Sequence, residues 1–255
     1  MTIKEQIIIS FTSFPARINK THLAAECLLR QTYPNIRVIL WLSMNQFPLC
    51  EIPSKLKRLQ DYGLEIRFVE GDVRSHKKYY YTFQEFRDCL VFLADDDIFY
   101  PTTIVESTYN KYLQYGGEKV VVGNYGCRIE YKEDGLLTPY LTWKLCNSSE
   151  FENNDNLFFG SGGGTMIRPC DLFEDVCKKE LFMKLTPTAD DVWLNAMSRL
   201  GNNKIIVLAK NYPLSVSIKN DIKLYKTNYG EENGNDIQIK AVSDYYKDTL
   251  NKRVF

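Results

Sequence analysis

The chain of 255 residues carries 32 Lys and Arg against 32 Asp and Glu, so its formal net charge is zero. With 44% hydrophobic and 25% charged residues, it has the composition of an ordinary globular protein that can bury a core without disulfides or a structural metal. The balanced charge argues against a general nucleic-acid-binding protein, which needs an excess of cations to neutralise phosphates.

The use of cysteine and histidine argues against a zinc cage. The 7 cysteines are scattered without a C-x-x-C pair, and the 2 histidines, His22 and His76, lie far apart. We therefore expect free thiols in a reducing compartment. The N-terminal stretch lacks a signal-peptide pattern, and no run approaches the roughly 18 apolar residues that span a bilayer. The sequence thus predicts a soluble, cytoplasmic protein.

The first hundred residues alternate between short apolar runs and longer segments with helical character. Such short, continuously apolar runs are typical of strands buried on both faces of a parallel sheet. Their alternation with helices indicates βαβ units in a doubly wound α/β sheet, which binds ligands at the carboxyl ends of its strands. The predicted strands are residues 6–10, 36–42, 65–69 and 90–94, and the predicted helices are residues 21–31, 54–62 and 82–88.

The pattern is less regular after residue 100. A polar, aromatic and glycine-rich stretch at 124–164 predicts irregular structure. Around it, the sequence predicts helices at 102–115, 190–200 and 238–250, and strands at 119–123 and 204–209.

Three adjacent carboxylates follow the predicted strand at 90–94, at the edge where ligands bind. Asp95, Asp96 and Asp97 repel one another, so a cation or solvent is needed to stabilise them. In extended chain Asp95 and Asp97 share a face, and a converging pair suits Mg²⁺ or Mn²⁺ completed by phosphate and water. The alternative is an acidic turn that caps the helix after Pro101.

Five segments resemble the GT-A-fold nucleotide-sugar glycosyltransferases, close to the bacterial family-2-like enzymes of capsule and lipopolysaccharide synthesis. They extend over most of residues 7–208, and their order and spacing make the likeness specific. The segments are residues 7–18 (IIISFTSFPARI), 28–41 (LLRQTYPNIRVILW), the DxD-type triplet 95–97, 159–166 (FGSGGGTM) and 185–193 (LTPTADDVW).

The resemblance implies a GT-A, Rossmann-like, mostly parallel central sheet with helices on both faces and an irregular acceptor-side region. It implies one glycosyltransferase domain over residues 1–210, with a nucleotide-binding half at about 1–100 and an acceptor half at about 101–210. Residues 211–255, which match nothing in the family, are expected to form a C-terminal extension packed on the same domain.

The resemblance also implies roles for residues on the donor side. Asp95 would lie near the nucleotide ribose or the metal, and Asp97 would ligate Mn²⁺ or Mg²⁺. The ion would offset charge on the departing nucleoside diphosphate. The other implied donor-binding residues are Thr12, Ser13, Arg17, Asp72, Lys77, Lys78, Asp96, Gly162 and Gly163. The alternatives are a surface arginine for Arg17, a solvated basic turn for the two lysines, and a flexible turn before a strand for the glycines.

The segment TADDVW would carry the catalytic base in the family. The resemblance places the base at Asp191, with Asp190 as the second candidate, and a base there would deprotonate an acceptor hydroxyl to give inversion. The alternative is a helix capping box formed by Thr188 and Asp191. Trp143 and Trp193 are candidate platforms for an acceptor sugar, and a core role is the alternative for Trp193.

The sequence thus predicts an inverting, metal-assisted transferase of a sugar from a nucleotide donor, most simply a UDP-sugar. The acceptor would be a saccharide or a lipid-linked saccharide, reached by peripheral contact at the inner face of the membrane. No histidine follows His76, so the metal would depend on carboxylates, phosphates and water. Two alternatives stay open: a Mg²⁺-dependent phosphohydrolase of the haloacid dehalogenase type and a non-catalytic carbohydrate- or nucleotide-binding module.

Overall fold

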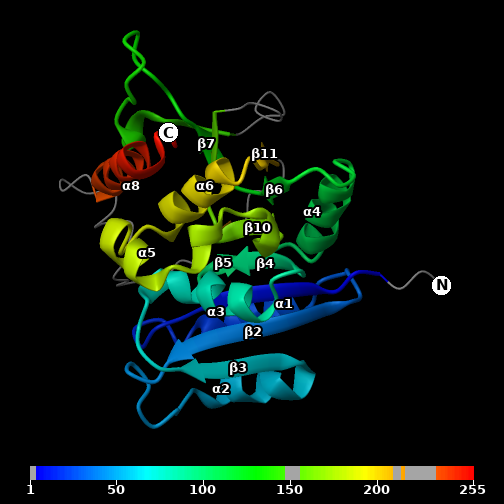
Figure 1. Ribbon diagram of the computed structural model, residues 1–255. Coiled ribbons are helices and arrows are strands. Elements are labelled where there is room, and N and C mark those ends of the chain that lie inside the picture. Colours follow the sequence, from blue (N-terminus) through cyan, green and yellow to red (C-terminus); the bar gives the residue numbers. More distant parts are fainter. Residues whose placement is uncertain (1–3, 147–155, 209–213, 216–233) are drawn as a thin grey trace.

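The computed structural model describes residues 4–146, 156–208, 214–215 and 234–255, and its centre is a seven-stranded sheet (Figure 1). The strand order is β11-β6-β10-β4-β1-β2-β3. All neighbouring strands pair in parallel except β10, which runs antiparallel to both β4 and β6. The strands are β1 (Ile7–Thr12), β2 (Ile36–Ser43), β3 (Leu64–Val69), β4 (Leu90–Ala94), β6 (Val120–Gly123), β10 (Gly163–Ile167) and β11 (Lys204–Val207).

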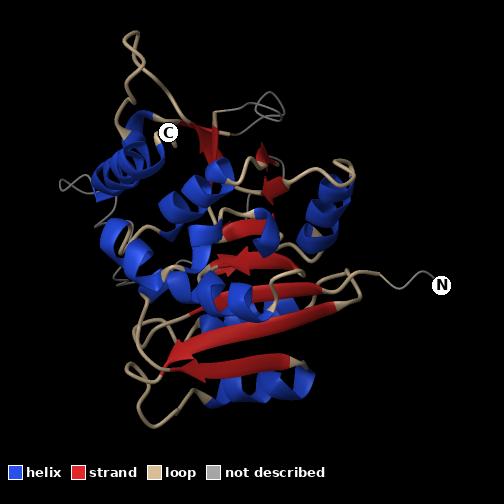
Figure 2. Ribbon diagram, viewed as in Figure 1, coloured by secondary structure: helices blue, strands red, loops and turns tan. Residues whose placement is uncertain are grey.

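Helices cover both faces of this sheet, as expected (Figure 2). Alternate side chains of β1 enter different cores: Ile8 belongs to one cluster of buried residues, and Ile7 and Ile9 belong to the other. The first core is closed by α3 (Lys77–Glu85), α5 (Lys179–Leu185), α6 (Asp190–Leu200) and α8 (Gly234–Leu250). The second is closed by α1 (Thr21–Leu29), α2 (Ser54–Arg58) and α4 (Ile104–Leu113). The mostly parallel α/β architecture is thereby confirmed.

Two small antiparallel sheets flank the central one. In the first, β7 (Gly126–Arg128) pairs with both β8 (Lys144–Leu145) and β9 (Leu157–Phe159). This sheet occupies part of the stretch that the sequence predicted to be irregular, whose residues 147–155 lie outside the described part. In the second, β5 (Ile98–Phe99) pairs with β12 (Leu214–Ser215). A strand of the C-terminal extension thus pairs with the short strand that directly follows the acidic triplet.

Two segments differ from the sequence prediction. The segment 159–166, most of which falls in the stretch predicted to be irregular, contains the end of β9 and most of β10, an inner strand of the sheet. Its glycines have low strand propensity, and only pairing with β4 and β6 makes the strand. The helix predicted at 82–88 begins five residues earlier, because Lys77 and Lys78 are buried in its first turn rather than exposed on a basic turn.

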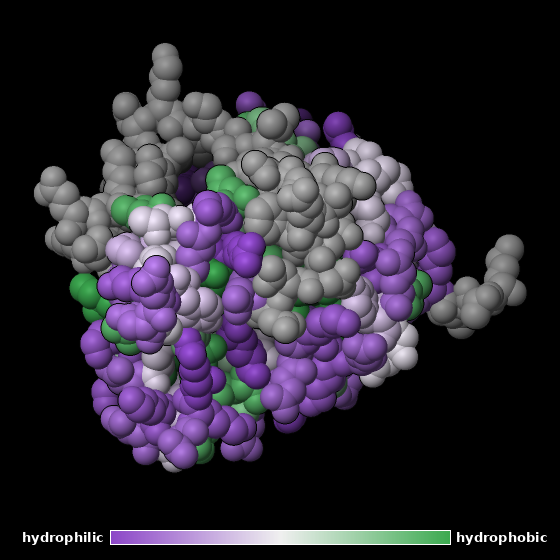
Figure 3. Space-filling view, turned by 90° about the horizontal axis from the view of Figure 1, so that it is seen from above, coloured by the Kyte–Doolittle hydropathy of each residue, from purple (hydrophilic) through white to green (hydrophobic). Residues whose placement is uncertain are grey.

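Among the described residues, no helix has the length and apolar character needed to cross a bilayer. On the face shown in Figure 3 the described surface is mainly hydrophilic, and hydrophobic residues form small separate groups. Residues 211–213 and 216–233 of the predicted extension, and residue 209 of the strand predicted at 204–209, lie outside the described residues.

Candidate active site

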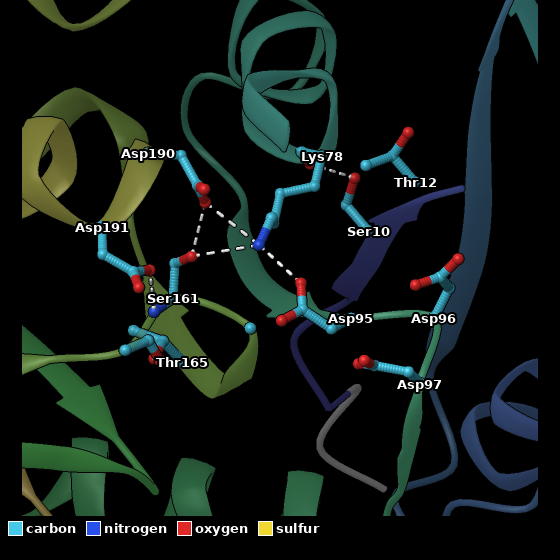
Figure 4. A network of polar contacts seen from close by, with 12 residues as sticks. Ser10, Thr12, Lys78, Asp95, Asp96, Asp97, Ser161, Thr165, Asp190 and Asp191 are labelled. Carbon is cyan, nitrogen blue, oxygen red and sulfur yellow. Dashed lines mark hydrogen bonds and ion pairs between the residues drawn. The ribbon is translucent and has the colours of Figure 1, made fainter. Parts of the chain in front are cut away.

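A polar network joins five segments of the chain at one edge of the sheet (Figure 4). It contains the carboxyl ends of β1 and β4, the start of α3, the β9–β10 connection and the start of α6. Parallel strands place their carboxyl ends together, which explains why residues so far apart in the sequence meet here.

The acidic triplet divides its side chains between two directions. Asp95 and Asp97 turn to one side and Asp96 to the other, as the extended backbone predicts (Figure 4). Asp96 is buried, accepts a hydrogen bond from Ser13 Oγ at 2.5 Å and pairs with Arg17 at 2.9 Å. Arg17 also lies 3.0 Å from Asp97. Burial and then the charge of Asp95 raise the pKa of Asp97 to about 6. The nearby Arg17 therefore does not fully offset the negative charge around this carboxylate.

Lys78 connects the two acidic motifs. Its buried ammonium lies 2.6 Å from Asp95 Oδ1, 3.0 Å from Asp190 Oδ2 and 3.2 Å from Ser161 Oγ. Ser10 Oγ donates a 2.5 Å hydrogen bond to the Lys78 carbonyl and so anchors the helix that carries it to β1. Burial opposes a charged lysine, but Asp190 and Asp95 outweigh it and raise the pKa of Lys78. The ammonium is therefore an internal counter-ion.

Ser161 holds the two acids at the start of α6. Its backbone N–H donates to Asp191 Oδ1 at 2.7 Å, and its hydroxyl donates to Asp190 Oδ2 at 2.6 Å. Burial alone would raise the pKa of Asp190, but Lys78 overrides it and lowers the value to about 2. Burial and then the charge of Asp190 raise the pKa of Asp191 to about 6. Asp191 is therefore the better proton acceptor of the two near neutral pH.

The predicted capping box is absent, so the alternative interpretation of this segment is wrong. The N-cap of α6 is Ala189 and makes no side-chain cap hydrogen bond. The Thr188 hydroxyl instead accepts from Gln238 Nε2 at 2.9 Å, and Asp191 points to Ser161 rather than to its own helix end. The local pattern was misleading because both side chains have partners that are distant in the sequence.

The glycine segment lies against the acidic triplet. A Cβ built on Gly162 would be 1.8 Å from Asp95 Oδ2, so only glycine leaves room for that carboxylate. Tyr100 joins the same two segments: its hydroxyl accepts from the Asp95 N–H at 2.7 Å and donates to the Gly162 carbonyl. A Cβ on Gly163 would meet Tyr125 at 2.4 Å. Close packing within the protein thus accounts for both glycines.

The cations predicted to bind phosphate are mostly paired within the protein. Arg17 binds Asp96 and Asp97, Lys78 binds Asp95 and Asp190, and the buried Lys77 binds Asp72. Each of these three cations is therefore positioned by a carboxylate of the protein.

Two residues predicted to bind the donor, Thr12 and Asp72, also have hydrogen-bond partners within the protein. Thr12 Oγ1 donates to the Trp41 carbonyl at 2.8 Å. Asp72 accepts from Gln46 Nε2 at 2.8 Å and from the Arg74 N–H at 2.9 Å. Arg74 is itself exposed, and it is therefore the cation of this loop with the best access to a ligand.

Both predicted sugar platforms are core residues, which corrects their assignment to acceptor binding. Trp193 is fully buried, and its indole N–H donates to the Val176 carbonyl at 2.9 Å. Trp143 is 6% exposed and donates to the Thr138 carbonyl at 3.2 Å. A buried ring cannot stack on a ligand, so neither tryptophan is an acceptor platform in this structure.

The donor set fits a divalent ion in part. Asp95 and Asp97 converge, and their oxygens are the ligands that Mg²⁺ and Mn²⁺ prefer. The carboxylates of Asp95, Asp96, Asp97, Asp190 and Asp191 outnumber the two cations among them, Arg17 and Lys78, which favours a further cation. Within the described ranges, no group of three or more His, Cys, Asp or Glu side chains is arranged to hold a metal. Further ligands would therefore come from diphosphate and water.

Three residues that complete the site had no assigned role in the sequence. Ser161 lies inside a glycine-rich run, and such a run indicates a role for the backbone rather than for a side chain. Asn195 stands four residues after Asp191 on the same helix face, and its Nδ2 donates to the Asp191 carbonyl at 2.9 Å and to the Phe159 carbonyl at 2.8 Å. That spacing was a usable signal, whereas nothing local marks Tyr100.

Comparison with solved structures supports the GT-A-like fold. The crystal structure of S. aureus TarS 1–349 matches with a TM-score of 0.53 and 12% identity, covering 96% of this chain and 73% of that one. The 4-diphosphocytidyl-2C-methyl-D-erythritol synthase of Anaerococcus prevotii DSM 20548 matches with a TM-score of 0.50 and 11% identity, covering 84% and 94%. The mannosyltransferase PcManGT of Pyrobaculum calidifontis, in complex with GDP-Man and Mn²⁺, is a weaker match, with a TM-score of 0.49 and 13% identity, covering 86% and 59%, and the fold assignment does not depend on it.

No protein-family model and no curated protein sequence matches the chain. At identities this low the likenesses show a shared fold, and the chemistry must be argued from the site.

Proposed function

We propose that this protein is an inverting glycosyltransferase that moves a sugar from a nucleotide-sugar donor, a UDP-sugar in the first instance, to an acceptor hydroxyl. The observation that carries the proposal is the pair of acidic groups joined by Lys78. The carboxylates of Asp95 and Asp97, which we propose bind the cation, lie on one side, and Asp191, with its pKa raised to about 6, lies on the other.

Asp191 is suited to remove the acceptor proton. At neutral pH a group with a pKa of about 6 is mostly ionised and still basic enough to accept a proton in the transition state. The Ser161 N–H fixes one carboxylate oxygen, so the orientation of the side chain is set before substrate arrives. As the acceptor oxygen bonds to the anomeric carbon, its proton passes to Asp191. The bond between the anomeric carbon and the diphosphate oxygen breaks at the same time, and its electron pair leaves with the nucleoside diphosphate.

The donor is proposed to lie over the carboxyl ends of β1 and β4, with Asp72 and Thr12 towards the nucleoside and Arg74 towards the phosphates. A Mn²⁺ or Mg²⁺ ion bound by Asp97 and Asp95 would offset the negative charge of the leaving diphosphate. Arg17 and Lys78 keep these carboxylates in place, and Asp96 anchors Arg17.

The acceptor is proposed to be a saccharide or a lipid-linked saccharide of surface-polysaccharide synthesis, reached from the cytoplasm by peripheral contact with the inner membrane face. This part of the proposal is supported by the sequence resemblance alone. The dehalogenase-type hydrolase is not favoured, because Asp95 follows the fourth strand and Asp190 begins a helix instead of ending a strand.

Calorimetric titration with UDP, GDP and dTDP, each with Mn²⁺ and with EDTA, tests the donor half of the proposal. We expect one nucleotide to bind in the micromolar range with Mn²⁺ and at least about tenfold more weakly with EDTA, since the metal joins phosphate to carboxylate. Asp97→Asn should abolish that metal effect while leaving the fold intact. A protein that binds none of the three diphosphates in Mn²⁺ or Mg²⁺ contradicts the proposal.

A further inference from the structure

The C-terminal helix α8 is built into the core beside the proposed base. It lies next to α5 and α6 (Figure 1), and its buried Ile239, Val242 and Tyr246 belong to the same cluster as Trp193 and Phe182 of those helices. Two polar ties fix it further: Asp236 Oδ1 accepts from the Tyr140 N–H at 2.8 Å, and the Tyr246 hydroxyl donates to Asp175 at 2.8 Å. The docking of the helix thus has several independent supports.

One further side chain of α8 contacts the segment that leads to the base. The amide of Gln238 is buried, and its Oε1 accepts from the Thr188 N–H at 3.0 Å. Its Nε2 donates to Thr188 Oγ1 at 2.9 Å and to the Gly234 carbonyl at 2.9 Å. Gln238 therefore binds both the backbone and the side chain of a residue two positions before Asp190.

This contact replaces a cap at the start of α6. Helices usually fix their first turn with an N-cap side chain, and α6 has none at Ala189. The approach to the helix is held instead on two sides, by Gln238 at Thr188 and by His76 Nε2, which lies 2.6 Å from the Thr186 carbonyl. The chain direction at this point determines where the carboxylate of Asp191 lies.

We propose that Gln238 is a positioning residue for the transfer reaction: through Thr188 it sets the start of α6 and thereby the placement of the Asp191 carboxylate. The C-terminal extension is then part of the active site and not an appendage. This inference rests on the proposed function, and its closing experiment includes a readout that does not depend on turnover.

The test compares three single substitutions in the full chain. Gln238→Leu keeps the volume and removes both hydrogen bonds between residue 238 and Thr188, and Gln238→Glu keeps an acceptor for the Thr188 N–H. Tyr246→Phe is the matched control, because it keeps the ring and removes one buried hydrogen bond of the same helix, made to Asp175 and not to the segment that leads to the base. The measurements are kcat, donor affinity, melting temperature and amide hydrogen exchange of the peptide that spans residues 186–195.

Gln238→Leu should lower kcat by at least about tenfold with donor affinity changed less than about twofold, since the base is misplaced and the donor site is untouched. Gln238→Glu should recover part of that loss. Exchange of the first amides of α6 should quicken in Gln238→Leu and not in Tyr246→Phe. If Gln238→Leu lowers kcat no more than Tyr246→Phe at matched stability, or leaves exchange unchanged, Gln238 only docks the helix. If the wild-type protein transfers no sugar, the proposed function fails, while the exchange measurement still tests the positioning.

Discussion

Gly162→Ala should disable the proposed metal side of the site while leaving the fold almost intact. The three atoms nearest to the added methyl all belong to the Asp95 carboxyl group, at 1.8, 2.0 and 2.3 Å. To reach an ordinary contact of 3.4 Å from 1.8 Å, the nearest oxygen must retreat by about 1.6 Å. The backbone at Gly162 is not left-handed, so alanine itself adds no strain there.

The displacement breaks the 2.6 Å contact between Asp95 and Lys78 and separates Asp95 from Asp97. A misplacement of about 1 Å can lower an enzymatic rate about 100-fold, so kcat/KM should fall by at least that factor, about 2.7 kcal/mol. The Asp95 side chain is 38% exposed and can swing towards solvent, so the free energy of unfolding should fall by only about 1 kcal/mol.

The assay is nucleoside diphosphate release at saturating Mn²⁺, together with urea unfolding. The control is the same change in an Asp95→Ala background, where the methyl meets no carboxylate and should have no further effect. Activity within threefold of wild type, or an equal loss in both backgrounds, refutes the steric role of Gly162.

Two further predictions follow from the charges of the network, and one follows from exposure. In wild type kcat/KM should fall as the pH drops through about 6, because Asp191 takes up a proton. Asp190→Asn removes a neighbouring negative charge, so the midpoint of this pH profile should move to lower pH. An unchanged or higher midpoint contradicts the assignment of the titration to Asp191. Lys78→Met leaves two carboxylates without their buried cation and should lower the free energy of unfolding in urea at pH 7 by about 3–5 kcal/mol, and by less at pH 5. Arg74→Ala should raise the donor KM about tenfold with kcat little changed, and a fall in kcat alone would exclude a binding role.

Much of the sheet could be predicted because its strands are short, apolar and buried on both faces. Residues 90–94 and the helix at 190–200 have the boundaries that the sequence pattern indicates. Local patterns failed where distant partners decide the structure. The strand β10 was missed because Gly162, Gly163 and Gly164, at and just before its start, favour a turn, and pairing with β4 and β6 overrides that preference.

The acidic residues of the candidate site could be predicted from the sequence, whereas most of their partners could not. Carboxylates at a strand end and at a helix start are visible in the sequence, and Asp95, Asp190 and Asp191 do meet in one network. The partners of Arg17 and Lys78 were not, because these ion pairs join residues that lie between 17 and 112 positions apart, which leaves no local pattern. The burial of Trp143 was hidden for the same reason, since its ring packs against Tyr140 and the distant Phe158.

The most direct test of the proposed reaction is nucleoside diphosphate release from a panel of UDP-, GDP- and dTDP-sugars, with Mn²⁺ and with EDTA, for wild type and for Asp191→Asn. The protein should release diphosphate slowly from one donor, only with the metal present. Asp191→Asn should lower that rate about 100-fold or more while donor binding persists. Release of free phosphate from sugar phosphates, or a wild-type rate unaffected by Asp191→Asn, would contradict a metal-assisted sugar transfer with Asp191 as its base.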